Sequence, residues 1–158
     1  MNHLITGGAG FIGCNLAHTL LSRGGPVTIF DNLSRPLTSL NLEWLRQQYG
    51  ERLRFIQGDI RDFEVMRSVV PGHDVVYHLA GQVAVTTSVL DPRSDFEINA
   101  TGTLNVLEAA RLAEKPPIVF FASTNKVYGG METVAITEQP TRYTYRDSTA
   151  WDPRDAAA

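Results

Sequence analysis

The fold is decided by the stretch Thr6-Gly7-Gly8-Ala9-Gly10-Phe11-Ile12-Gly13-Cys14. An apolar pair, Leu4-Ile5, precedes it and predicts a buried strand, and apolar residues at helical spacing follow it as far as Leu21. A glycine-rich turn between a strand and a helix lets the backbone approach a phosphate closely, and the start of the helix attracts the anion. The stretch therefore predicts a dinucleotide-binding turn, in both the Gly8-x-Gly10-x-x-Gly13 and the Gly7-x-x-Gly10-x-x-Gly13 spacings.

An acidic residue follows the second apolar run. Val27-Thr28-Ile29-Phe30 ends in Asp31, within the interval of about 20 residues at which such turns are followed by a ribose-binding acid. A carboxylate there accepts both ribose hydroxyls and repels a 2′-phosphate, which favours NAD over NADP, although Arg35 close by favours the phosphate. A capping role for Asp31 is the alternative interpretation.

Composition argues against several classes of function. The 158 residues are 43% hydrophobic and 20% charged with a net charge of −3 and no basic run, which argues against nucleic acid or an anionic membrane as partner. The single cysteine, Cys14, cannot form an internal disulfide, and no Cys/His cluster has metal-ligand spacing, so no metal site is predicted. The first strand leaves no room for a signal peptide after Met1, and no apolar run approaches the ~20 residues of a membrane span. A cytoplasmic location is therefore expected.

Strands alternate with helices along the chain, which predicts an α/β fold. After the first strand, further strands are expected at 27–30, 53–56, 74–79 and 118–122, and helices at 11–22, 40–49, 63–70 and 94–112. Right-handed crossovers then give a Rossmann-type doubly wound parallel sheet in the order 3-2-1-4-5, truncated after about five strands. Residues 1–145 are expected to form one NAD-binding domain, and 146–158 a mobile tail because apolar periodicity disappears after Thr141.

Ligands of such a sheet bind outside the carboxyl ends of its strands, where the strand order reverses. Asp59 and Ile60 follow the third strand and either flank an adenine or form a simple turn. Small residues in Leu79-Ala80-Gly81 would let a cofactor lie against the backbone after the fourth strand. Hydroxyls in 123–129 either bond a substrate oxygen or form a Ser/Thr turn, and His78 is interpreted as structural.

Taken together, these motifs resemble the extended short-chain dehydrogenase/reductase family of NAD-dependent sugar-nucleotide epimerases and dehydratases. The resemblance is carried by Thr6 to Gly13, Asp31-Asn32-Leu33-Ser34, Gly58-Asp59-Ile60-Arg61-Asp62, His78-Leu79-Ala80-Gly81, Asn99-x-x-Gly102-Thr103 and Val127-Tyr128-Gly129. Within the family, residues 81–88 and 123–129 are similar to those of the 2-epimerases that act on CDP-sugars. Asn125 and Lys126 stand where the dehydratases carry an Asp-Glu pair, which counts against a dehydratase.

The resemblance implies a role for each matched position. Gly10, Phe11 and Ile12 would hold the pyrophosphate in the turn that includes Gly7 and Gly13; Asp31, Asn32, Ser34 and Arg35 the adenosine ribose and its surroundings; Asp59 and Ile60 the adenine; and Leu79, Ala80, Gly81 and Asn99 the rest of NAD. Thr124 matches the catalytic Ser/Thr that hydrogen-bonds the sugar oxygen.

One feature departs from the family. The family transfers a proton with a Tyr-x-x-x-Lys pair, and this sequence lacks that pair. Its two lysines are Lys115 and Lys126, and the residues four positions before them are Arg111 and Ala122. The family's later strands and C-terminal sugar-nucleotide domain are also absent, and the chain covers under half of a typical member. The expected function is therefore the NAD-binding portion of a sugar-nucleotide 2-epimerase, whose full-length relatives take a nucleotide-sugar, with a CDP-sugar favoured. A non-catalytic NAD-binding module or a truncated remnant is the alternative.

Without the later strands, the fifth strand would be an unpaired apolar edge of the sheet. We therefore expect self-association, or a partner chain that completes the sheet.

Overall fold

The computed structural model describes residues 1–124, 127, 129–130, 132 and 134–146. Its internal contacts divide the chain into two units, Met1–Ala122 and Ser123–Ala158, each of which is described by itself. The second unit contains an antiparallel hairpin of β6 (Ile136–Glu138) and β7 (Tyr143–Tyr145), which apolar periodicity does not predict. The expected tail lies, from residue 147 onward, outside the described residues.

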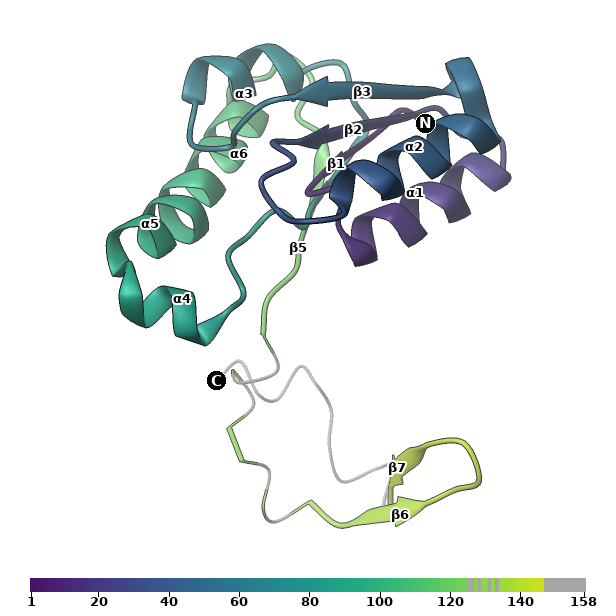
Figure 1. Cartoon of the computed structure of the whole chain (residues 1–158), viewed down its shortest axis with the longest axis vertical. Helices are drawn as coiled ribbons and strands as arrows, with labels where there is room; N and C mark the ends of the chain where they lie inside the picture. Colours follow the sequence, from purple (N-terminus) through teal and green to yellow (C-terminus); the bar gives the residue numbers. More distant parts are fainter. Residues whose placement is uncertain (125–126, 128, 131, 133, 147–158) are drawn as a thin grey trace. The chain divides into compact units, whose positions relative to one another are not determined.

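A five-stranded parallel sheet forms the centre of the first unit (Figure 1). Its strands are β1 (His3–Thr6), β2 (Val27–Asp31), β3 (Leu53–Gln57), β4 (Val75–His78) and β5 (Ile118–Phe121). They lie in the order β3-β2-β1-β4-β5, so the predicted doubly wound topology is confirmed. Thr6 pairs with Phe30 on one side and with His78 on the other, so the carboxyl ends of the three central strands meet at one edge.

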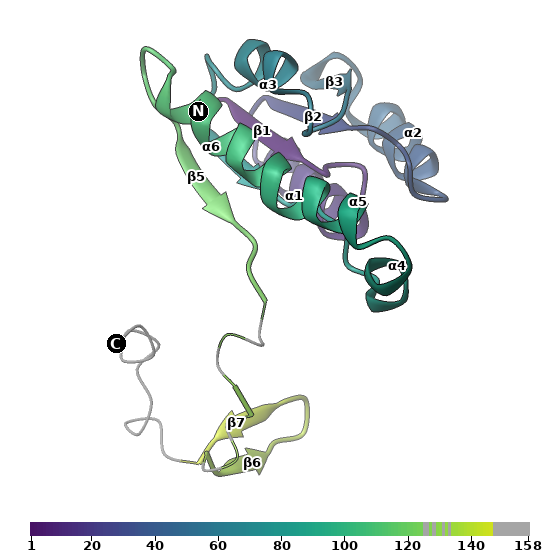
Figure 2. The same ribbon diagram turned by 90° about the vertical axis from the view of Figure 1, so that its left-hand side faces the viewer.

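Helices cover both faces of this sheet (Figure 2). One face carries α1 (Phe11–Ser22) and α2 (Thr38–Tyr49), and the other carries α3 (Phe63–Val69) and α6 (Gly102–Arg111). The remaining helical segments are a 3-10 turn η1 (Gly50–Arg52), α4 (Val85–Leu90), α5 (Pro92–Phe96) and a π turn η2 (Glu97–Thr101). The interruption predicted at Asp91-Pro92 is the break between α4 and α5. Asp91 caps α5 there by accepting a hydrogen bond from the Ser94 amide at 3.1 Å.

Alternate residues of each central strand enter different halves of the core. In β1, Leu4 packs in the cluster beneath α3 and α6, whereas Ile5 packs in the cluster beneath α1 and α2, and both are fully buried. Cys14 lies in the second cluster, so it packs α1 against the sheet as expected. Because both faces of the strands are covered, their sequences read as continuous apolar runs.

The strand β5 differs from the central strands in its exposure. Ile118, Phe120 and Phe121 are each more than half exposed. Among the helices of the described residues, none combines the length and the apolar character needed to cross a membrane.

Candidate cofactor site

The glycine turn between β1 and α1 packs tightly against neighbouring backbone. Gly7 has a φ of +70°, and a Cβ placed on it would lie 2.6 Å from the amide nitrogen of Ala80. A Cβ on Gly13 would meet the carbonyl oxygen of Gly7 and lie 2.6 Å from the Cα of Gly8. The glycines at 7 and 13 are thus required by the close approach of the turn to the β4 loop and to the start of α1.

The start of α1 leaves its amide groups available to an anion. Gly10 is the N-cap, no described side chain caps it, and the first turn contains no acidic residue. The first amides of a helix lack partners within the helix and carry its partial positive charge. Phe11 and Ile12 are 82% and 65% exposed, so this end of the helix is open to solvent. These features fit the pyrophosphate role implied for residues 10–12.

Asp31 connects the glycine turn to the loop after β2. Its Oδ2 accepts a hydrogen bond from the Ala9 amide at 3.1 Å, and its Oδ1 accepts one from the Leu33 amide at 2.8 Å. A carboxylate has about four lone-pair positions, so two remain for hydroxyl donors. The capping and ribose-binding interpretations of Asp31 are therefore compatible.

The loop after β2 reaches both neighbouring loops. The Asn32 side-chain amide donates to Asp59 Oδ2 at 3.1 Å, and its Oδ1 accepts the Ser34 amide at 3.0 Å. The Arg35 guanidinium donates to Gln82 Oε1 at 3.1 Å. The structure thus brings the predicted residues of the β2 and β3 ends together and connects them to the β4 loop.

Arg61 neutralises Asp59, a contact that the sequence does not predict. Nε of Arg61 donates to Oδ1 at 3.0 Å and Nη2 to Oδ2 at 2.8 Å, and these bonds hold the pKa of Asp59 down at about 2. The only signal was the presence of Arg61 in the motif that contains Asp59. Ile60 is a core residue, 5% exposed, and its carbonyl accepts a hydrogen bond from the Asn105 side-chain amide at 3.0 Å, which ties the loop after β3 to α6.

Asn99 lies in the π turn η2 and clamps the loop after β4. Its Oδ1 accepts the Gln82 amide at 2.8 Å, and its Nδ2 donates to the Gln82 carbonyl at 3.0 Å. The Leu79 amide donates to the Thr6 carbonyl at 3.1 Å, so Leu79 continues the alignment of β4 with β1. A π turn within a helix is frequent at functional sites. Gln82, another residue absent from the predicted site, is held by both Asn99 and Arg35.

Thr124, the predicted catalytic residue, lies in the second unit, which is described by itself. The neighbouring Asn125, Lys126 and Tyr128 lie outside the described residues.

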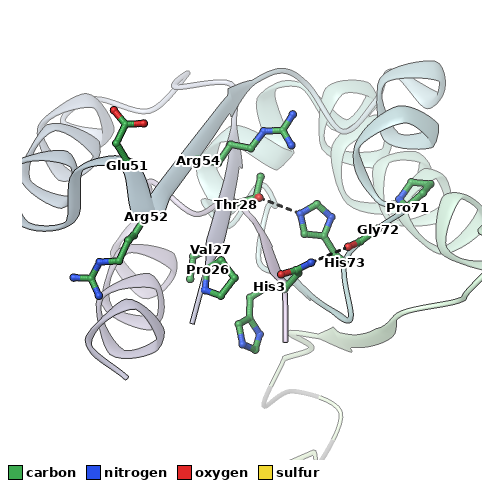
Figure 3. A pocket seen from close by; sticks show the side chains of 11 residues that line it. His3, Pro26, Val27, Thr28, Glu51, Arg52, Arg54, Pro71, Gly72 and His73 are labelled. Carbon is green, nitrogen blue, oxygen red and sulfur yellow. Dashed lines mark hydrogen bonds between the residues drawn. The ribbon is translucent and has the colours of Figure 1, made fainter. Parts of the chain in front are cut away.

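A hollow of about 340 Å³ opens at the opposite ends of the strands (Figure 3). Arg54 and His73 line it, together with Thr28, whose hydroxyl lies 3.0 Å from His73 Nε2. None of its lining residues is a predicted site residue. The candidate site is therefore the surface formed by the loops at the carboxyl ends.

Comparison with known proteins identifies the family. A family model described as GDP-mannose 4,6 dehydratase matches residues 4–148. The chain belongs to this family. It is 47% identical over 149 residues to a CDP-paratose 2-epimerase from Salmonella typhi, an alignment that covers 93% of this chain.

Solved structures of the family share the fold. A UDP-glucose 4-epimerase from Stenotrophomonas maltophila, with bound NAD and formylated UDP-arabinopyranose, matches 82% of this chain with a TM-score of 0.73 and 34% identity. The dTDP-glucose 4,6-dehydratase DesIV from Streptomyces venezuelae, with NAD and TYD bound, matches 82% with a TM-score of 0.72 and 34% identity.

The chain spans less than half the length of these relatives. It covers 44% of the CDP-paratose 2-epimerase, 38% of the Stenotrophomonas structure and 41% of the Streptomyces structure.

Proposed function

We propose that this chain binds NAD across the carboxyl ends of β1 to β4 and is the NAD-binding portion of a sugar-nucleotide 2-epimerase. The observation that carries the proposal is the placement of Asp31. Its carboxylate is fixed by the amides of Ala9 and Leu33, beside an uncapped helix start, and keeps two positions for the hydroxyls of a ribose. NAD in the two solved relatives supports the choice of dinucleotide.

Each predicted residue has a proposed part in holding NAD. Gly7, Gly10, Phe11, Ile12 and Gly13 hold the pyrophosphate; Asp31, Asn32, Ser34 and Arg35 the adenosine ribose and its surroundings; Asp59 and Ile60 the adenine; and Leu79, Ala80, Gly81 and Asn99 the remainder. When bound, NAD supplies a hydride acceptor that returns the hydride to the sugar. For Thr124 we propose the role that the family resemblance implies, in which its hydroxyl hydrogen-bonds the sugar oxygen.

The substrate class is proposed from the similarity to the Salmonella CDP-paratose 2-epimerase, which favours a CDP-sugar. An epimerase is favoured over a dehydratase because Asn125 and Lys126 cannot replace the carboxylic acid and carboxylate that eliminate water.

Calorimetric titration of the 158-residue chain with NAD and with NADP tests the cofactor proposal. We expect NAD to bind more tightly, because Asp31 repels a 2′-phosphate at close range. Equal affinity for the two dinucleotides, or binding of neither, contradicts the proposal.

A second candidate is a non-catalytic NAD-binding module. It is favoured by the lack of Tyr-x-x-x-Lys in these 158 residues, the spacing at which the family's lysine lowers the pKa of its tyrosine for proton transfer. The module requires NAD binding without turnover of a CDP-sugar by this chain alone. Turnover by the pure chain that is abolished in Thr124→Ala excludes the module and assigns catalysis to the chain itself.

A further inference from the structure

A row of hydrogen bonds crosses the first unit through His78. Thr6 Oγ1 lies 2.7 Å from His78 Nδ1, and Thr103 Oγ1 lies 3.0 Å from His78 Nε2. At its two ends, the Ala80 amide lies 3.4 Å from Thr6 Oγ1, and Thr103 Oγ1 lies 2.6 Å from the Asn99 carbonyl oxygen. The row joins the end of β1, the end of β4 and the π turn.

The chemistry of the groups fixes the direction of every bond. The Asn99 carbonyl only accepts, so the Thr103 hydroxyl gives it its single proton and must itself accept from His78 Nε2. The neutral ring then carries its proton on Nε2, and Nδ1 accepts from the Thr6 hydroxyl. Thr6 Oγ1 in turn accepts from the Ala80 amide. All four bonds are satisfied by one tautomer of a neutral histidine.

His78 is only 2% exposed, and Thr6 is fully buried. Protonation of Nδ1 would turn this nitrogen from an acceptor into a donor and force the Thr6 hydroxyl to find another acceptor inside the core. Burial opposes that change, since it lowers the pKa of His78 to about 4. The directions of these four hydrogen bonds are therefore maintained across the neutral pH range.

We infer that His78, in its neutral Nε2–H form, is a positioning residue that fixes the wall of the NAD site formed by the β4 loop and the π turn. Each end of the row is a residue proposed to line the cofactor, Ala80 at one end and Asn99 at the other. Asn99 in turn fixes the β4 loop, because its side chain hydrogen-bonds both the amide and the carbonyl of Gln82. The part of the test below that measures NAD affinity rests on the proposed function, the binding of NAD.

The pair Thr103→Val and Thr103→Ser separates the hydrogen bond from the packing. Valine keeps the shape of threonine but cannot accept from His78 or donate to Asn99, whereas serine keeps the hydroxyl. We expect the Kd for NAD to rise about tenfold in Thr103→Val, the equivalent of one hydrogen bond, and to stay within about twofold in Thr103→Ser.

Thr28→Val is the matched control. Thr28 is 6% exposed and also pairs its hydroxyl with a histidine, His73, but at the opposite ends of the strands (Figure 3). A role in stability alone predicts that Thr28→Val and Thr103→Val lower the melting temperature with no change in NAD affinity. The inference predicts that only Thr103→Val alters affinity.

Nitrogen NMR of the chain without NAD provides a readout independent of cofactor binding. We expect His78 Nδ1 to resonate as an unprotonated nitrogen and Nε2 as a protonated one, and the Gly81 and Gln82 amides to shift in Thr103→Val but not in Thr103→Ser. A proton on Nδ1, unshifted amides, or a Thr28→Val variant that loses NAD equally overturns the inference. If the wild type binds no NAD, the proposed function fails, and these resonances alone decide the positioning role.

Discussion

The Asp31 carboxylate accepts hydrogen bonds from the amides of Ala9 and Leu33 and is also the group proposed to bind the ribose. A substitution there alters the turn and the ligand contact together, so its effect on binding must be separated from its effect on folding. Asp74 offers the comparison. It accepts the Asn2 amide at 2.8 Å but precedes β4, at the amino ends of the strands.

We predict that Asp31→Ala weakens NAD binding by about 1–3 kcal/mol, the range for losing hydrogen bonds to a charged group. Asp74→Ala also loses an accepted backbone amide and is expected to leave the NAD affinity unchanged. Calorimetric titration of both variants measures the difference. Equal losses would assign the effect to folding, and no loss in Asp31→Ala would remove the carboxylate from the site.

Protonation of His78 should make the fold sensitive to mild acid. Its pKa is lowered by burial to about 4, against about 6.5 in an unfolded chain. The unfolded state therefore binds the proton first as pH falls, so stability is fully present above about pH 6.5 and is lost towards pH 4. The loss attributable to His78 is of the order of 3 kcal/mol.

Urea unfolding at a series of pH values measures this loss. The pKa values of His3 and His73 are also lowered, with burial as the main cause, so they add a slope of the same sign. The difference between wild type and His78→Gln isolates His78, because the contributions of groups present in both chains cancel; these groups include Asp59, Asp74 and Glu108, whose pKa values are also lowered. An NMR titration that shows His78 charging near pH 6.5 in the folded chain would contradict the prediction.

The sequence predicted the separate residues of the site better than the bonds between them. Asp31 was assigned because it directly follows an apolar run, and Asp59 because it lies in the loop after the third strand, where topology places ligand contacts. Arg61 and Gln82 were not assigned, since their roles depend on side-chain geometry: Gln82 meets Arg35 across 47 positions of sequence. The binding roles of the site residues remain predictions.

At the scale of elements, the turn between β1 and α1 combines a positive φ with close packing. Gly7 and Gly72 have φ values of +70° and +86°, so both favour glycine. They differ in their surroundings: a Cβ on Gly7 would lie 2.6 Å from the Ala80 amide nitrogen, whereas a Cβ on Gly72 would meet nothing within 4 Å.

We predict that Gly72→Ala destabilises the chain by about 1–2 kcal/mol, the cost of the left-handed backbone alone. Gly7→Ala should cost about 1–3 kcal/mol more, because the added methyl group forces the turn and the β4 loop apart. Denaturant titration of both variants compares the two losses. Similar free energies of unfolding would show that the turn can shift to accept a side chain.

The elements themselves were largely readable from the sequence. Apolar strands alternating with amphipathic helices gave the sheet order, and Asp91-Pro92 gave the break before α5. The π turn η2 was not predicted, because one widened turn barely disturbs a helical apolar pattern. The hairpin of β6 and β7 was missed because each strand has only three residues, too few to form an apolar run.

At the scale of the whole molecule, β5 is the element that determines whether the chain associates with other chains. It pairs with β4, and no strand of the described residues pairs with its other side. The amides of Ile118 and Ala122 donate to the chain at the two ends of β4, so the alternating amides of Val119 and Phe121 point to the open side. Exposed apolar side chains accompany these unpaired groups, and such an edge recruits further strands.

We predict that the 158-residue chain self-associates through β5, because strand pairing there would satisfy the open amides and cover Ile118 and Phe120. A lysine in an edge strand opposes such pairing, so Ile118→Lys is expected to shift association to at least about tenfold higher concentration. Leu37→Lys is the control, since Leu37 is exposed and apolar but lies in the loop before α2. Light scattering and sedimentation over a concentration series measure the association. A wild-type chain that stays monomeric at high concentration, or a Leu37→Lys variant as dissociated as Ile118→Lys, would show that β5 is not the contact.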